Sequence, residues 1–190
     1  MTASRTFEDA LGKLNSDFFF REFTFSTNAF TPTPSEELEL ADKIVWLDDL
    51  MMVYQFKQRF AETETTPDKE RKWFESVVMD QGTRQIRDTL SYLKQYPQIE
   101  LKNDRGDAFN VATAEATPHK LVIYYSHELL PEDCVLQKYH YSRTAGIIHV
   151  LRADHYFEIL NTLVTPVEIW DYFDIERDWQ TVSNKGSKSV

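Results

Sequence analysis

Three polar side chains in a mostly apolar stretch have the residue types needed for metal-assisted chemistry. Residues 38–59, LELADKIVWLDDLMMVYQFKQR, contain Asp42, Gln55 and Lys57 among large apolar neighbours. Carboxylate, amide and backbone carbonyl oxygens are ligands that suit Mg²⁺, and the ion usually keeps several waters. A lysine beside such an ion can hold an attacking water and stabilise negative charge as it develops. Together these residue types suit hydrolysis of a phosphodiester bond.

The same stretch has the pattern of a β-hairpin that would bring the three side chains together. Two apolar runs flank Asp48-Asp49, which predicts two antiparallel strands with the turn at this pair. With the loop centre between the two aspartates, residues whose numbers sum to 97 face each other, so Asp42 lies opposite Gln55. Side chains alternate along a strand, so Gln55 and Lys57 share a face. We therefore expect Asp42, Gln55 and Lys57 to converge on one patch.

An alternative interpretation is that Gln55 and Lys57 simply mark a solvated strand face. Polar residues two apart on a strand commonly do so, and an aspartate near a strand start is also common. A solvated face would be polar at its other positions as well. The neighbours on this face are instead apolar, namely Leu40, Ile44, Trp46, Met51 and Val53.

The spacing also carries a family resemblance. Asp42, twelve intervening residues and then Gln55-Phe56-Lys57 resemble the PD-(D/E)xK nuclease superfamily, in the variant where glutamine replaces the second acid, as in Mrr-like restriction endonucleases. Ala41 stands at the position of the proline that names the family. The resemblance extends over roughly residues 6–100. It implies magnesium-dependent DNA cleavage and the element order helix, three strands, helix and a further strand.

The resemblance implies roles for the individual residues. Asp42, the side-chain carbonyl of Gln55 and the backbone carbonyl of Phe56 would hold Mg²⁺ or Mn²⁺, and Lys57 would be catalytic. Gln55 cannot add a second negative charge, so the ion would be held less tightly than between two carboxylates. General resemblance to restriction and defence nucleases makes bacterial or phage defence the expected setting.

Glu8 is a fourth expected member of the site. Helical spacing of apolar residues predicts a helix that starts near Thr6 and contains Glu8. About ten helical residues span roughly 15 Å, and about five strand residues from the hairpin loop to Asp42 span roughly 17 Å. Glu8 therefore reaches the level of Asp42, where related nucleases often place a helical glutamate. The alternative is a solvated glutamate favoured by the helix dipole.

Apolar periodicity predicts the rest of the architecture as one domain over residues 1–180, with a disordered tail at 181–190. The predicted strands are residues 18–25, the hairpin, 119–126 and 146–151, and the predicted helices follow Thr66-Pro67 as far as Pro97, cover 154–163 and run from Pro166 to about Trp179. Residues 100–118 contain turn formers, and residues 128–146 are predicted as a loop segment. The fold class is α/β, a restriction-endonuclease-like mixed central sheet flanked by helices, with extra C-terminal helices.

Composition sets bounds on partners and compartment. The net charge of −10 is unusual for a protein that binds phosphates, which normally requires a basic surface. The single cysteine, Cys134, excludes an intramolecular disulfide and argues against structural zinc. No signal-like or membrane-spanning run is present, so we expect a cytoplasmic protein that does not bind membranes. The expected partner is a DNA substrate, and the sequence leaves open a protein partner or a homo-oligomer.

Two other functions remain open at this stage. One is a catalytically inactive nuclease-fold protein with a binding or regulatory role, and the other is an acidic inhibitor that mimics DNA. Basic charge gathered around Lys57 would favour the enzyme. A Lys57 without acidic neighbours would favour the inactive binder, and a continuous acidic face would favour the mimic.

Overall fold

The computed structural model describes residues 3–26, 28–33, 36–48, 50–60, 64–113 and 117–186. Its centre is a mixed six-stranded sheet in the order β1-β4-β5-β8-β10-β9. The strands are β1 (Thr24–Phe25), β4 (Lys43–Leu47), β5 (Leu50–Gln58), β8 (His119–Tyr125), β9 (Tyr139–Ser142) and β10 (Gly146–Arg152). The pairs β5–β8 and β8–β10 are parallel and the other neighbours are antiparallel.

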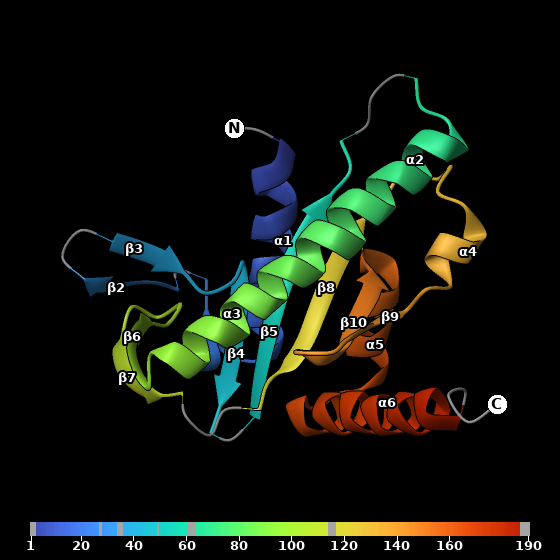
Figure 1. The fold of residues 1–190 in the computed structure, drawn as a ribbon. Coiled ribbons are helices and arrows are strands. Elements are labelled where there is room, and N and C mark those ends of the chain that lie inside the picture. Colours follow the sequence, from blue (N-terminus) through green and yellow to red (C-terminus); the bar gives the residue numbers. More distant parts are fainter. Residues whose placement is uncertain are drawn as a thin grey trace.

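Helices cover both faces of this sheet (Figure 1). One face is covered by a long helical segment made of α2 (Pro67–Trp73), the π-helical η2 (Phe74–Gly82) and α3 (Thr83–Gln95). The other face packs against α1 (Ala3–Phe18), α5 (Ala153–Thr162) and α6 (Pro166–Gly186). The predicted α/β class, with a mixed sheet between helices and further helices at the C-terminal end, is confirmed in these terms.

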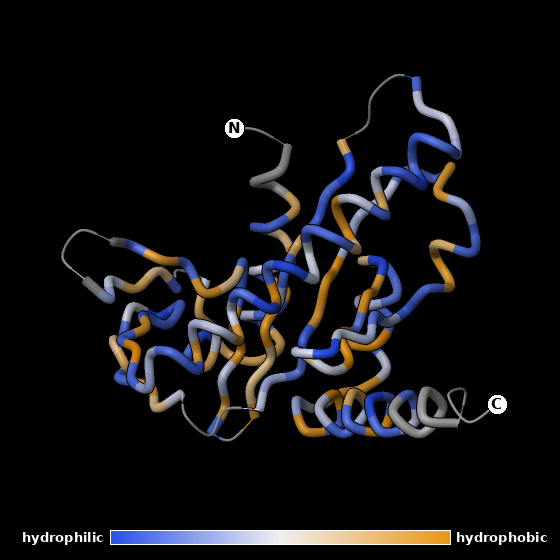
Figure 2. Tube along the Cα trace, viewed as in Figure 1, coloured by the Kyte–Doolittle hydropathy of each residue, from blue (hydrophilic) through white to orange (hydrophobic). Residues whose placement is uncertain are grey.

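Two hydrophobic cores fill the space between the sheet and its helices. On the α2–α3 side, Phe74, Val78 and Ile86 pack against Val53 and Val122. On the other side a separate cluster is built from Leu11, Val45, Tyr54, Leu121, Ile123, Tyr156 and Phe173. Because both faces are covered, β8 is apolar along most of its length, as buried parallel strands are. Figure 2 shows the contrast in β5, which becomes hydrophilic toward its C-terminal end.

Two small hairpins lie beside the sheet and were not predicted as such. One consists of β2 (Ala29–Thr33) and β3 (Glu36–Glu39), and the other of β6 (Gln98–Lys102) and β7 (Ala108–Ala112). The second replaces the loop expected over residues 100–118. Figure 1 places both hairpins next to each other, close to the end of α3.

Several predicted boundaries are wrong. The strand expected over 18–25 is reduced to Thr24–Phe25, because α1 continues to Phe18 and η1 (Arg21–Phe23) follows it. The aromatic residues there suggested a strand, but Phe19 is buried in the core under α1. The expected loop over 128–146 contains α4 (Glu132–Val135) and β9. Within the predicted tail, α6 continues to Gly186, and residues 187–190 lie outside the described part.

Two of the three helix starts that rest on capping residues are confirmed; the third is wrong, because α1 begins at Ala3 and Thr6 lies inside it. Thr66 precedes Pro67 at the start of α2, and its side chain accepts a hydrogen bond from the Lys69 backbone amide. At α6, Glu168 N donates to Thr165 Oγ1 and Thr165 N donates to Glu168 Oε2, which is the predicted capping box. No helix in the described ranges is long and apolar enough to cross a membrane.

Candidate functional site

The hairpin places Asp42, Gln55 and Lys57 together. The register pairs Lys43 with Tyr54 and continues to Leu47 with Leu50, so the predicted sum of 97 is confirmed. Asp49, one of the two predicted turn residues, lies outside the described residues. Asp42 immediately precedes β4, and its Oδ2 accepts a hydrogen bond of 2.5 Å from the Phe56 backbone amide.

Lys57, which follows Phe56 on β5, completes this arrangement. Its Nζ lies 3.7 Å from Asp42 Oδ2 and donates a hydrogen bond of 3.0 Å to the Phe56 carbonyl. The side chain is only 8% exposed. A methyl group added at Gly82 would lie 2.9 Å from Val122 Cγ1 and 3.7 Å from Lys57 Cε. The missing side chain at Gly82 therefore lets the α2–α3 segment approach the sheet closely enough to enclose the lysine stem.

Gln55 is buried, yet its side-chain oxygen has no hydrogen-bond partner. The residue is 3% exposed, and among the described residues no donor reaches Oε1. A buried carbonyl without a partner costs roughly 1–3 kcal/mol. Gln55 lines a small pocket of about 190 Å³ together with Asp42, Glu39 and Gln85. Gln85 Oε1 is likewise buried without a hydrogen bond among the described residues. The pocket thus offers acceptor oxygens that only a donor or a cation can satisfy.

Glu8 and Glu39 add carboxylates to the same site. Both line a cleft of about 1100 Å³ that Asp42 also lines. The negative charge of Glu8 acts on the pKa of Lys57, and it acts on that of Glu39 together with Asp42. The structure therefore brings Glu8 into the neighbourhood that its helical position predicted.

Glu39 was missed by the sequence-based reasoning. Alternation along one continuous strand over 38–47 would place it on the face opposite to Asp42. The chain instead interrupts its strand pairing between Glu39, the last residue of β3, and Lys43, the first of β4. Leu40 and Ala41 in this break are both buried. No sequence signal marks the break.

Burial disfavours the charged forms of Asp42, Lys57 and Glu39. Burial raises the pKa of Asp42, and the nearby Lys57 ammonium only partly offsets this. Burial likewise lowers the pKa of Lys57 against the attraction of Asp42 and Glu8. Partial desolvation raises the pKa of Glu39, and the charges of Asp42 and Glu8 raise it further. Asp42 and Glu39 thus bring like charge together in a partly desolvated place, and a positive charge bound beside them would favour their ionised forms.

The oxygen atoms of this site suit the binding of a hydrated divalent ion. No three His, Cys, Asp or Glu side chains within the described ranges form a ready-made metal cluster. Mg²⁺, however, is commonly bound by one or two carboxylates while it keeps several waters. Asp42 and the unpartnered Gln55 oxygen offer such a set, with Glu8 and Glu39 near enough to act electrostatically. The Phe56 carbonyl accepts from Lys57 and has a second lone pair for the ion.

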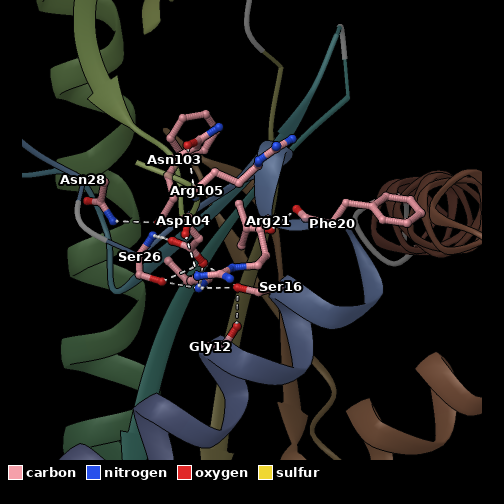
Figure 3. Close-up of polar contacts among 12 residues, drawn as sticks. Gly12, Ser16, Phe20, Arg21, Ser26, Asn28, Asn103, Asp104 and Arg105 are labelled. Atoms are coloured by element: carbon pink, nitrogen blue, oxygen red, sulfur yellow. Dashed lines mark hydrogen bonds and ion pairs between the residues drawn. The ribbon is translucent and has the colours of Figure 1, made fainter. Parts of the chain in front are cut away.

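A second polar cluster lies at the far end of the large cleft and was not predicted (Figure 3). Lys43 is buried and forms an ion pair of 2.8 Å with Asp104 in the β6–β7 loop. Asp104 also accepts hydrogen bonds from the Ser16 hydroxyl and from the Ser26 backbone amide. Burial alone would raise the pKa of Asp104, but these bonds, chiefly that from Lys43, lower it. The cluster joins α1, β4 and the β6–β7 loop.

The other sequence candidates do not join these sites. Cys134 is a buried free thiol on α4 that accepts a weak contact from Arg71. Residues 138–143, KYHYSR, mix basic and aromatic side chains and contain β9, at the sheet edge opposite to β1. Comparison with known proteins yields nothing: no protein-family model, no curated protein and no solved structure matches the chain.

Proposed function

We propose that the protein is a divalent-metal-dependent nuclease that hydrolyses DNA phosphodiester bonds, with a PD-(D/E)xK-type site in which Gln55 replaces the second acid. The observation that carries the proposal is the convergence of Asp42, Lys57 and an unpartnered, buried Gln55 oxygen at one point of the sheet. The proposed cofactor is Mg²⁺ or Mn²⁺.

The order of the elements supports the same proposal. The chain runs from α1 through the antiparallel strands β1, β4 and β5, crosses one sheet face as α2–α3, and returns as β8 parallel to β5. Within the central sheet and its helices this order agrees with the helix, three strands, helix and strand that the resemblance implies, while the β2–β3 and β6–β7 hairpins are inserted between β1 and β4 and between α3 and β8. β10, β9, α5 and α6 extend it at the C-terminal end.

The residues of the chain have separable tasks in such a reaction. Asp42 and Gln55 would hold the ion, which when bound polarises a phosphoryl oxygen and acidifies a bound water. The Phe56 amide fixes the orientation of Asp42, and the Phe56 carbonyl fixes that of Lys57. In hydrolysis a water oxygen bonds to phosphorus while the bond to the leaving oxygen breaks, and the leaving oxygen takes up a proton. Lys57 can hold the water and stabilise the negative charge on the phosphoryl oxygens.

The surroundings of Lys57 favour an enzyme over an inactive nuclease-fold binder. Asp42 lies 3.7 Å from its Nζ, and Glu8 acts on its pKa. Expected of an inactive binder was a Lys57 without acidic neighbours, and the described residues around it do not fit that expectation. An inactive nuclease-fold binder would be identified by a lack of metal-dependent cleavage.

The test is cleavage of duplex and single-stranded DNA with Mg²⁺, with Mn²⁺ and with EDTA. Lys57→Ala should lower the cleavage rate by about 10²–10³, the usual effect of losing one electrostatic donor, while metal binding persists. Asp42→Asn should weaken metal binding itself. Lys69→Gln on α2, an exposed lysine, is the matched control and should cleave like the wild type.

Metal binding is measured separately, as the rise in unfolding temperature on adding Mg²⁺. At ten times the Kd, an ion that binds only the folded state stabilises it by about 1.4 kcal/mol. Residual cleavage that is identical in wild type and Lys57→Ala would indicate contamination. That result would refute the nuclease and leave the inactive binder.

A further inference from the structure

The large cleft has an acidic end and a basic end. Glu8, Glu39 and Asp42 line it near the proposed metal site. At the other end the lining includes Lys13 and Arg21 of the α1–η1 segment and Lys102 and Arg105 of the β6–β7 hairpin. The same lining includes Asp17, which pairs with Lys13, and Asp104, which pairs with Lys43, so the excess positive charge at this end comes from Arg21, Lys102 and Arg105. In a chain with a net charge of −10, that local excess needs an explanation.

We infer that this basic end binds the sugar–phosphate backbone of a nucleic-acid strand beside the bond to be cleaved, with Lys102 and Arg105 as phosphate contacts. The inference rests on the proposed nuclease function and adds the place where its substrate lies. A substrate phosphate held at the acidic end by a cation leaves the neighbouring phosphates of the same strand to be neutralised by the protein. Lysine and arginine side chains are the usual groups for that purpose.

The β6–β7 loop is held rigidly enough to serve as such a wall (Figure 3). The Asp104 backbone amide donates to the Thr24 carbonyl at 2.8 Å, and Asn103 Nδ2 donates to the Glu22 carbonyl at 3.0 Å. Asn103 Oδ1 in turn accepts from the backbone amides of Arg105 and Asp107. A loop fixed before binding loses little conformational freedom when a ligand arrives.

The buried Lys43–Asp104 ion pair removes the negative charge of Asp104 from the β6–β7 loop, so the side of the loop that lines the cleft is positively charged. Lys43 neutralises Asp104 from inside, at 2.8 Å. Lys102 and Arg105 remain exposed. Arg105 pairs with Glu22 at 2.6 Å, but both side chains are about half exposed, and such surface pairs contribute little. A phosphate can therefore replace the Glu22 carboxylate at small cost.

The experiment measures binding apart from cleavage. Fluorescence anisotropy of labelled duplex DNA, single-stranded DNA and single-stranded RNA is recorded over a range of salt concentrations, with full-length protein in EDTA. The variants are Lys102→Gln, Arg105→Gln and the double variant, and Lys69→Gln on α2 is the control. All four replace exposed side chains, and unchanged unfolding temperatures confirm that the fold is intact.

Each phosphate contact contributes about 0.9 to the slope of log K against log salt on duplex DNA, and about 0.7 on a single strand. Each single variant should lower the slope by about that amount and the double variant by about twice as much, uniformly across sequences. Lys69→Gln should leave the slope unchanged. The probe with the steepest slope identifies the kind of nucleic acid that the cleft accommodates.

Slopes equal to the wild type in Lys102→Gln and Arg105→Gln would overturn the inference, as would a wild type that binds none of the probes. Both results are independent of the cleavage assay. A protein that cleaves DNA but shows unaltered slopes in the variants is a nuclease that holds its substrate elsewhere. A protein whose slopes fall as expected but that does not cleave uses the cleft as a binding site only.

Discussion

The Asp42–Lys57 pair should make the folded protein less stable than an uncharged pair of similar shape would. The two charges lie 3.7 Å apart, which corresponds to an attraction of about 4.5 kcal/mol at an effective dielectric constant of about 20. Removing two ions from water costs several kcal/mol for each. The pKa of Asp42 is raised and that of Lys57 is lowered, with burial as the largest cause in both. Desolvation therefore outweighs the attraction.

The perturbation is a cycle of Asp42→Asn, Lys57→Met and the double variant. Methionine keeps most of the lysine stem in the space that Gly82 leaves open. Replacing a buried ion pair by uncharged residues often stabilises by about 1–4 kcal/mol. Asp42 is 22% exposed, so the lower half of that range, about 1–2 kcal/mol, applies here. For a chain of this length that corresponds to a rise of about 2–8 °C in unfolding temperature.

Lys57→Met alone should have the opposite effect. It leaves Asp42 next to Glu8 and Glu39 without the cation that balances them, and unfolding should occur at a lower temperature than in the wild type. Mg²⁺ should restore much of that loss, because it supplies the missing positive charge. Thermal unfolding followed by circular dichroism in EDTA and then in Mg²⁺ measures every corner of the cycle. A double variant less stable than the wild type in EDTA would refute the reasoning, since the pair would then be net stabilising.

Two further predictions concern single titratable or polar groups. Gln55→Glu adds a carboxylate beside Asp42 and should lower the unfolding temperature in EDTA. Adding Mg²⁺ should then raise the unfolding temperature of this variant by more than it raises that of the wild type. An equal rise in both proteins would mean that residue 55 does not face the ion. Burial lowers the pKa of His149 to about 3, so below pH 6.5 the unfolded chain binds a proton that the folded protein does not. The free energy of unfolding should therefore fall by up to about 1.4 kcal/mol per pH unit from this group as pH drops from 6.5 toward 4, and His149→Phe should flatten that part of a urea-denaturation pH profile.

Local patterns predicted the parts of the fold that local chemistry determines. The hairpin register follows from two apolar runs around an aspartate pair, because a shift by one residue would turn every side chain to the wrong face. The starts of α2 and α6 follow from Thr66 and from the Thr165–Glu168 capping box. For the same reason the positions of Asp42, Gln55 and Lys57 relative to one another could be obtained from spacing alone.

The missed parts depend on contacts between distant segments. Lys43 and Asp104 are 61 residues apart, and nothing near either one indicates the other. In the β6–β7 hairpin the first strand, QIELK, does alternate between exposed and buried residues, but it is short and its partner β7 is mostly exposed, so alternation does not mark the second strand. The stretch 18–25 has the aromatic residues of a strand, but packing of Phe19 under α1 decides its conformation. Tertiary packing overrides local preference in each case.

A single bound cation would offset several unfavourable features of the candidate site. Among the described residues, Gln55 Oε1 is buried without a hydrogen-bond partner. Burial disfavours the charged forms of both Asp42 and Lys57. Asp42 and Glu8 also place like charge near Glu39. Each feature costs folding free energy, and apolar residues at Asp42, Gln55 and Lys57 would suit a buried sheet better. A bound divalent cation would satisfy the oxygen and balance the carboxylates at once. Buried polar atoms without a partner also occur elsewhere in the described residues, but here one ligand would relieve several unfavourable features together, as is expected of a functional site.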